Sequence, residues 1–232
     1  MSKRINSALH DSLRAIQDWN IDVRQFAVYL TGETRDYGVN DEVDEPGVDY
    51  QMSARLIKNL QILASLDPIR PILIHMKTCG GDWNEGMAIY DNIKLASNPV
   101  VMLNHTHASS MSSIFFQAAD RRVMMPHSHF MFHDGTLNVS GTYKGAITNV
   151  EWFKKEHPIM VDIYAGKMKE KGRYSKLAKE DIKKMLEEQM NRKENVFLMA
   201  QEAVSWGLAD SIFDGNWNKL TKYFRRPKIN LR

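Results

Sequence analysis

A serine and a histidine in the middle of the sequence are residues of the types that acyl transfer uses. Transfer of an acyl group by a serine needs the hydroxyl to lie against an imidazole, and it needs backbone N–H donors for the oxyanion of the tetrahedral intermediate. Ser110 follows a hydrophobic run and opens a helical pattern, and His133 ends another hydrophobic run. The two residues are therefore the candidate nucleophile and general base.

Two backbone groups are candidates for the oxyanion donors. Gly80 and Gly81 follow the strand expected over residues 71–76, and glycine can expose its N–H in conformations that are closed to residues with side chains. Met111 begins the helix expected after Ser110, and the first N–H groups of a helix have no intrahelical acceptor. The helix dipole favours negative charge at the same place. We expect the N–H groups of Gly81 and Met111 to form the oxyanion hole.

Each of these features also has a simpler explanation. A serine at a helix start is more often an N-cap than a nucleophile. A pair of glycines after a strand is usually a turn, and a histidine at a strand end can be a buried, hydrogen-bonded imidazole. The features must therefore be judged together, by their order and spacing.

Four ordered motifs resemble those of the Clp protease proteolytic subunit (ClpP) family. They are Cys79-Gly80-Gly81 with Gly-Met-Ala-Ile-Tyr-Asp at 86–91, Ala108-Ser109-Ser110-Met111, the segment 126–133 ending in His133, and the closing segment 202–212. The resemblance covers residues 21–213. It implies that Ser110 attacks the scissile carbonyl, that His133 takes and returns the proton, and that Gly81 and Met111 hold the oxyanion.

The sequence departs from the family pattern near these motifs. Asn195 stands where the family has the aspartate of its triad, which predicts reduced activity because an amide offers no charge to stabilise the imidazolium. Glu194 is the neighbouring alternative, and we favour Asn195 on the helical geometry of adjacent positions. Thr106 and Ser112 replace glycines, which predicts crowding around Ser110, and Cys79 replaces a proline.

The fold class implied by the resemblance is α/β, a ClpP/crotonase-like fold of repeated ββα-type units with a protruding helical handle. One ClpP-like domain is expected over residues 1–232, with its core at 20–213. Three further regions are expected: an acidic loop insertion at 35–47, a handle region at 140–185 and a basic C-terminal tail at 214–232.

Hydrophobic periodicity predicts the individual elements. Helices are expected over residues 5–19, 50–67, 84–96, 110–119 and 146–169, with a last long helix ending near Asn195. Strands are expected over residues 26–30, 71–76, 100–103, 122–125, 129–132 and 209–213. The alternation of strand and helix predicts parallel βαβ units.

Composition narrows the class of function. The net charge of +3 on 232 residues is too balanced for a nucleic-acid footprint, and a single cysteine permits no intrachain disulfide. No signal-peptide pattern or membrane-spanning run is evident, so we expect a cytoplasmic protein without membrane association. The histidines at 105, 107, 127, 129 and 133 lack metal-ligand spacing, so no metal and no cofactor is assigned.

The resemblance also implies partners. Peptides or unfolded proteins are the expected substrates, and a homo-oligomer of heptameric rings, stacked in pairs through the helix at 146–169, is the expected assembly. In the family a surface pocket receives loops of a hexameric AAA+ unfoldase. The corresponding residues are Gln61, Leu73, His75, Leu95 and Phe213. Two of the five are polar, which predicts weak docking of such an unfoldase.

Other functions remain open at this point. Asn195 and the lost glycines fit a catalytically weak or inactive ClpP-like structural subunit, and a phage head-maturation protease is a related alternative. A crotonase-like acyl-CoA enzyme would share the architecture and the backbone oxyanion hole. Labelling with a serine-directed fluorophosphonate separates a peptidase from the inactive subunit and the crotonase-like enzyme.

Overall fold

The computed structural model describes residues 7–32 and 45–222, and within them eight strands form one sheet. The strands are β1 (Ile21–Asp22), β2 (Ala27–Thr31), β3 (Ile72–Thr78), β4 (Val100–Ser109), β5 (Arg121–Met124), β6 (His129–Phe132), β7 (Val196–Met199) and β8 (Ser211–Ile212). Their main order is β1-β2-β3-β4-β5-β8, with β6 paired to β4 and β7. The β1–β2 and β6–β7 pairs are antiparallel, and the other pairs are parallel.

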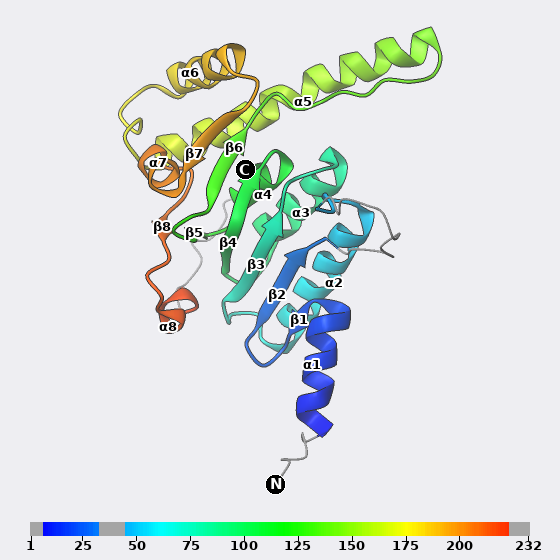
Figure 1. Cartoon of the computed structure of the whole chain (residues 1–232), viewed down its shortest axis with the longest axis vertical. Helices are drawn as coiled ribbons and strands as arrows, with labels where there is room; N and C mark the ends of the chain where they lie inside the picture. Colours follow the sequence, from blue (N-terminus) through cyan, green and yellow to red (C-terminus); the bar gives the residue numbers. More distant parts are fainter. Residues whose placement is uncertain (1–6, 33–44, 223–232) are drawn as a thin grey trace.

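Helices connect the strands and extend beyond the sheet (Figure 1). They are α1 (Ser7–Trp19), α2 (Tyr50–Leu66), α3 (Trp83–Leu95), α4 (Met111–Phe116), α5 (Tyr143–Glu170), α6 (Lys179–Arg192), α7 (Ala200–Trp206) and α8 (Trp217–Leu220). Figure 1 shows α5 running across the end of the sheet at which β6 ends and then projecting from the body. This helix is the protruding handle that the resemblance implies.

The two faces of the sheet bury two hydrophobic clusters. Successive side chains of a strand point to opposite faces, so Ile72 and Ile74 of β3 join the large cluster beneath the helices, whereas Leu73 joins a smaller one. Leu220 of α8 is buried in this smaller cluster. The C-terminal helix therefore covers part of the face opposite the main core.

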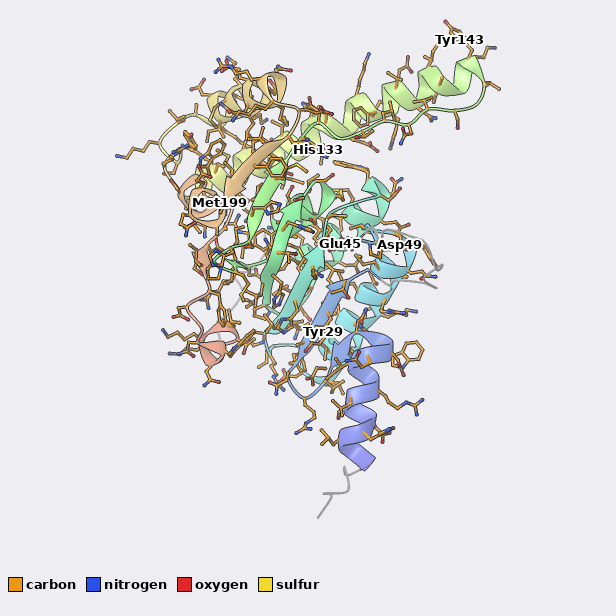
Figure 2. The ribbon with its side chains drawn as sticks, viewed as in Figure 1. Tyr29, Glu45, Asp49, His133, Tyr143 and Met199 are labelled. Carbon is orange, nitrogen blue, oxygen red and sulfur yellow. The ribbon has the colours of Figure 1, made fainter. Side chains whose placement is uncertain are left out.

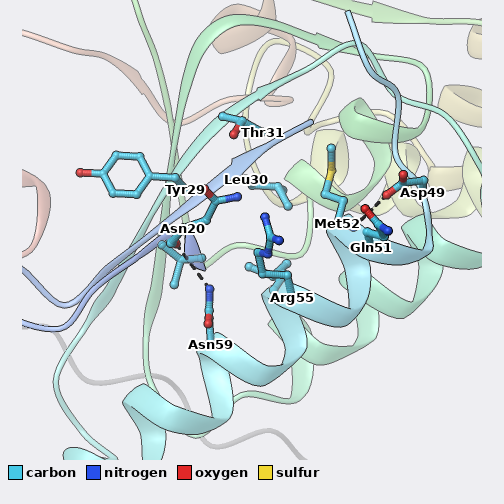
Figure 3. A pocket seen from close by; sticks show the side chains of 11 residues that line it. Asn20, Tyr29, Leu30, Thr31, Asp49, Gln51, Met52, Arg55 and Asn59 are labelled. Carbon is cyan, nitrogen blue, oxygen red and sulfur yellow. Dashed lines mark hydrogen bonds between the residues drawn. The ribbon is translucent and has the colours of Figure 1, made fainter. Parts of the chain in front are cut away.

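Polar caps and one buried amide hold α2 against the edge of the sheet. The Asp49 carboxylate accepts a hydrogen bond from the Met52 N–H at 2.8 Å, which satisfies a free donor at the helix start (Figure 3). The Asn59 amide donates to the Trp19 carbonyl at 2.7 Å and so connects α2 to the end of α1. Asp67 ends the helix, as expected from the sequence.

The second half of α5 is anchored and the first half is not. Tyr164 is fully buried, and its hydroxyl lies 2.6 Å from the Ser113 hydroxyl of α4. Burial raises the pKa of the Tyr164 phenol far above its ordinary value. At the other end, Tyr143 is 81% exposed and lies far from His133 (Figure 2).

The expected α/β class is confirmed, and most elements lie where the periodicity places them. β4 continues past Leu103 to Ser109. Its two histidines are half-buried on the sheet, so this segment is a strand and not a loop. α4 is shorter than expected and ends at Phe116. The last long helix ends at Arg192, where the sequence analysis placed its end near Asn195, and the unexpected strand β7 follows it.

Two regions of the sequence analysis are only partly covered by this description. Of the acidic loop at 35–47 the structure describes only residues 45–47, and of the basic tail at 214–232 it describes residues 214–222. Within the tail, residues 217–220 form α8, which the composition did not indicate. The mean composition is basic, but Trp217 and Leu220 are three positions apart and share one helical face.

Burial of α2 makes a stability prediction with a matched control. Leu63 is fully buried and Leu66, on the same helix, is 58% exposed. Leu63→Ala is expected to lower the free energy of unfolding by about 2–5 kcal/mol, because it leaves a cavity in the core. Leu66→Ala removes the same atoms and should cost less than about 1 kcal/mol. Urea titration of both variants checks this, and equal losses would contradict the burial of α2.

Candidate active site

Ser110 and His133 are in direct contact. The Ser110 Oγ lies 2.7 Å from His133 Nε2, which is hydrogen-bonding distance. Ser110 occupies the N-cap position of α4, yet its side chain makes no capping hydrogen bond there. The N-cap explanation of this serine is therefore not what the structure shows, because the hydroxyl is directed at the imidazole.

The backbone of Ser110 is held in an uncommon conformation. Its φ is +53° and its ψ is −129°, a region that residues with side chains rarely occupy. The surrounding structure fixes this conformation: the Ser110 N–H donates to the Met131 carbonyl at 3.0 Å, and the Ser110 carbonyl accepts from the Ser113 N–H at 3.0 Å. Strain of this kind persists where neighbouring contacts determine it, and it is common at active sites.

The glycine pair packs directly against the serine turn. A Cβ on Gly80 would lie 2.6 Å from the Ser109 carbonyl oxygen and 2.9 Å from the Met111 nitrogen, and a Cβ on Gly81 would lie 2.4 Å from the Val48 nitrogen. Both positions also have positive φ. Neither can carry a side chain without moving the backbone, so the turn after β3 lies beside the first N–H of α4. This brings the two predicted oxyanion residues, Gly81 and Met111, to the same side of the sheet as Ser110.

Ser112 and Thr106, the two residues that replace glycines of the family pattern, have different surroundings. Ser112 is fully buried, and its hydroxyl lies 2.8 Å from the Ser109 nitrogen and 2.9 Å from the Thr78 carbonyl oxygen. This hydroxyl links the β3 and β4 turns, so the serine is accommodated without a clash. Thr106 Oγ1 is buried and has no hydrogen-bond partner among the described residues.

His133 is poised as a neutral base. Its half-burial lowers the pKa of the imidazole below the ordinary value of 6.5, although the charges of Asp134 and Glu194 act in the opposite direction. A base must be unprotonated to accept the serine proton. Because the pKa is lowered, the neutral form dominates at neutral pH, and it is lost only as the pH falls through this lowered pKa.

Asn195 follows the β6–β7 register beside His133, one position beyond the Phe132–Val196 pair, but within the described chain its side chain is not bonded to the imidazole. Within the described residues no hydrogen bond joins Asn195 to His133, and Asn195 is exposed in the short segment between α6 and β7. The helical geometry used to prefer Asn195 over Glu194 does not apply, because α6 has already ended at Arg192. Glu194 is near enough for its charge to raise the pKa of His133.

One wall of the site was not expected from the motifs. A cavity of about 430 Å³ contains Ser110 and His133 and is closed on one side by α5. The α5 residues that line it are Asn149, Trp152, Phe153, Glu156, His157 and Met160. Their spacing of three and four positions is that of one helical face, so this periodicity was the signal that could have identified them.

Neither a metal-ligand cluster nor a membrane-spanning helix is found among the described residues. In residues 7–32 and 45–222 no three histidine, cysteine, aspartate or glutamate side chains gather in a way that could hold a metal ion. None of the described helices is long and apolar enough to cross a membrane.

The fold and the site define a class before any relative is considered. An α/β sheet with a projecting helix carries a hydroxyl–imidazole pair beside backbone N–H groups, as in acyl-transfer hydrolases. The sequence model of the Clp protease family matches residues 43–216, which is most of the chain, and the chain belongs to that family.

Curated relatives agree with this assignment. The chain is 32% identical over 173 residues to an ATP-dependent Clp protease proteolytic subunit 1 of Protochlamydia amoebophila, covering 72% of this chain and 77% of the relative. It is 27% identical over 169 residues to the ATP-dependent Clp protease proteolytic subunit of Deinococcus radiodurans, covering 72% and 76% respectively. A proteolytic subunit 2 of Treponema denticola is 29% identical over 168 residues, covering 71% and 77%.

The surroundings of His133 predict how the reactivity of Ser110 depends on pH. The rate of fluorophosphonate labelling should rise with pH to a plateau, with a midpoint below 6.5, because the pKa of His133 is lowered. Glu194→Gln removes a charge that raises this pKa, so its midpoint should fall further. Asn195→Asp adds a charge next to Glu194 and should move the midpoint up.

A control variant and one further substitution complete this experiment. Glu187→Gln, on the exposed side of α6, should leave the midpoint unchanged. Asn195→Ala should lower the plateau rate if the amide orients the imidazole during reaction. An undiminished plateau would remove Asn195 from the site, and a parent midpoint above 6.5 would contradict the neutral His133.

Proposed function

We propose that this chain is a serine peptidase of the ClpP type that hydrolyses peptides or unfolded proteins. The observation that carries the proposal is the 2.7 Å contact between Ser110 Oγ and His133 Nε2, made by a serine in a strained turn. Membership of the Clp protease family supports the reaction class. The roles of individual residues follow from their positions.

Acylation uses Ser110, His133 and two backbone donors. His133 Nε2 accepts the hydroxyl proton as Ser110 Oγ bonds to the carbonyl carbon of the scissile peptide. The N–H groups of Gly81 and Met111 donate to the resulting oxyanion, whose charge the start of α4 also favours. The imidazolium then returns the proton to the leaving amine, and an acyl-enzyme remains.

Deacylation repeats these steps with water. His133 takes a proton from the water that attacks the ester carbonyl, and the same backbone donors hold the second oxyanion. Collapse of that intermediate releases the acid and restores the Ser110 hydroxyl. The proposed third residue is Asn195, whose amide oxygen would orient His133 Nδ1 without adding charge.

A chambered assembly in the cytoplasm is the proposed setting. Helix α5 exposes several large apolar side chains: Ile147, Val150, Trp152 and Ile159 are between 37% and 57% exposed. Apolar side chains at this density on a projecting helix favour burial against another subunit. We propose heptameric rings stacked in pairs through this helix.

A catalytically weak or inactive structural subunit is the second candidate. The observation that favours it is the exposed Asn195, which makes no hydrogen bond to His133 within the described residues. A crotonase-like acyl-CoA enzyme has no use for the Ser110–His133 contact, which counts against it. Fluorophosphonate labelling separates these alternatives, because only an activated serine reacts.

The peptidase proposal predicts the effect of two substitutions. Ser110→Ala and His133→Ala should each lower the turnover of a fluorogenic peptide at least about 1,000-fold, because nucleophile and base act as a unit. The fold should persist in Ser110→Ala, because this side chain makes no capping bond in α4. Ser140→Ala, at an exposed position, is the control. Hydrolysis by Ser110→Ala at the parent rate would overturn the assignment.

The structure also bears on the unfoldase partner. Gln61 and Leu95 line a groove between α2 and α3, while Leu73 lies in the smaller cluster on the other face of the sheet. There α8 covers the sheet. The Trp217 ring lies 4.7 Å from the Phe213 ring and 6.1 Å from the His75 ring.

Weak docking of a generic unfoldase is the resulting prediction. A partner loop would have to displace Leu220, which is only 2% exposed, and then meet the polar His75. Mixing the oligomer with a ClpX-type unfoldase, ATP and a tagged folded substrate should give little degradation, while short peptides are cleaved without ATP. Efficient degradation of the folded substrate would contradict the prediction.

A further inference from the structure

The cavity that contains the catalytic pair also contains carboxylates that the reaction does not use. Asp82, Asp134 and Glu156 line it together with Ser110 and His133. Because Ser110 lines this cavity, the substrate residues on either side of the scissile bond occupy it. The charges of these side chains therefore bear on which substrate residues are accepted.

One of the three carboxylates contacts a histidine, and the other two contact no basic side chain among the described residues. Asp134 lies 3.3 Å from His157 Nδ1. Asp82 accepts the Glu85 N–H at 3.0 Å as the N-cap of α3, and Glu156 receives a hydrogen bond from Trp152. Within the described residues neither Asp82 nor Glu156 has a Lys, Arg or His nitrogen within 4.0 Å. Asp82 and Glu156 are thus left without a basic partner among the described residues of the cavity.

The two unpaired carboxylates influence each other. Half-burial raises the pKa of Glu156, the hydrogen bond from Trp152 opposes this, and the charge of Asp82 raises the pKa further. Both carboxylates line the same cavity, where like charges repel each other. A cation placed between them would relieve this repulsion, whereas an acidic side chain would add to it.

The remaining surroundings suit a long cationic side chain. Phe153 lines the same cavity and gives an apolar wall against which an alkyl stem can lie. Lys155 lies over the Trp152 ring, with its ammonium 5.5 Å from the ring centroid. Lys155 forms no ion pair with Glu156 among the described residues, so it does not neutralise that carboxylate. His133, with its lowered pKa, adds no positive charge at neutral pH.

We propose that Glu156, supported by Asp82, is a specificity-determining residue that selects peptides carrying a lysine or arginine close to the scissile bond. The inference rests on the proposed function, because it names the substrate class of the same cavity. It concerns the chemistry of the substrate side chain and leaves the roles of Ser110 and His133 unchanged.

Matched peptides test the selection. Internally quenched peptides of otherwise neutral sequence carry lysine, norleucine or glutamate at one position. Separate peptide sets place this residue at each of the two positions on either side of the cleaved bond. At one of these positions kcat/KM for lysine should exceed that for norleucine about fivefold to tenfold, and glutamate should be the poorest. Raising the salt concentration should reduce the lysine preference, because screening weakens the attraction.

Two variants on the same helix separate selection from general damage. Glu156→Gln should reduce the ratio of kcat/KM for lysine over norleucine at least threefold, by removing one of the two unpaired charges. Glu151→Gln is the control, because Glu151 is exposed and does not line the cavity. A parent ratio near one at every position, or a ratio unaffected by Glu156→Gln, would overturn the inference.

A binding measurement distinguishes failure of this inference from failure of the peptidase proposal. Ser110→Ala protein is titrated into each labelled peptide, and fluorescence anisotropy reports the Kd. If no peptide is hydrolysed but lysine peptides bind more tightly than norleucine peptides in a Glu156-dependent way, the peptidase proposal fails and the selection stands. If peptides are hydrolysed and bound without this dependence, the peptidase proposal stands and the selection fails.

Discussion

The close approach of the turns that follow β3 and β4 is the constraint on which the site depends. Parallel pairing places the ends of these strands side by side, with Thr78 opposite Ala108. Gly80 then lies against Ser109 and Met111 at distances that exclude any side chain. The Ser112 hydroxyl, bonded to both turns, holds them in this position. The proposed nucleophile and the proposed oxyanion donors are thus positioned by one backbone contact.

The histidine reaches the serine through the same strand. The C-terminal residues of β4 pair with β6, so that Ser109 lies opposite Met131. The Ser110 N–H donates to the Met131 carbonyl. His133 follows Met131 by two positions, and its ring therefore lies on the serine side. The negative charges that act on this imidazole are those of Asp134 and Glu194, and neither carboxylate is hydrogen-bonded to it among the described residues. In the proposed mechanism with Asn195 as the third residue, stabilisation of the oxyanion by backbone donors would supply more of the catalysis than in a triad with a carboxylate.

The sequence identified the contact between Ser110 and His133 because motifs with fixed order reflect fixed turns. Long elements such as α2 and β3 were predicted nearly to the residue, since α2 has one buried apolar face and β3 is a nearly continuous apolar run buried on both faces. Elements whose formation depends on tertiary packing were not predicted from the sequence. β7 is four residues long and pairs only with β6, and α8 depends on Leu220 entering a cluster formed by distant strands. The segment holding Asn195 was expected to be helical because the preceding pattern gave no sign that α6 ends at Arg192.

The α5 residues that line the cavity, called the substrate wall below, and the turn that holds Ser110 are fixed by different contacts. Pro158 lies within α5, where its ring removes one hydrogen bond of the helix and favours a bend. The buried residues of α5 begin at Met160, just after this proline, and Tyr164 anchors that half to Ser113 of α4. Phe153 and Glu156 lie on the other side of Pro158, on the half that projects from the body. A partner that covers the projecting half would therefore act on the position of the substrate wall, while the turn that holds Ser110 stays fixed by its own contacts. In the proposed peptidase, selection of substrates would thus respond to assembly without any change in the contact between Ser110 and His133.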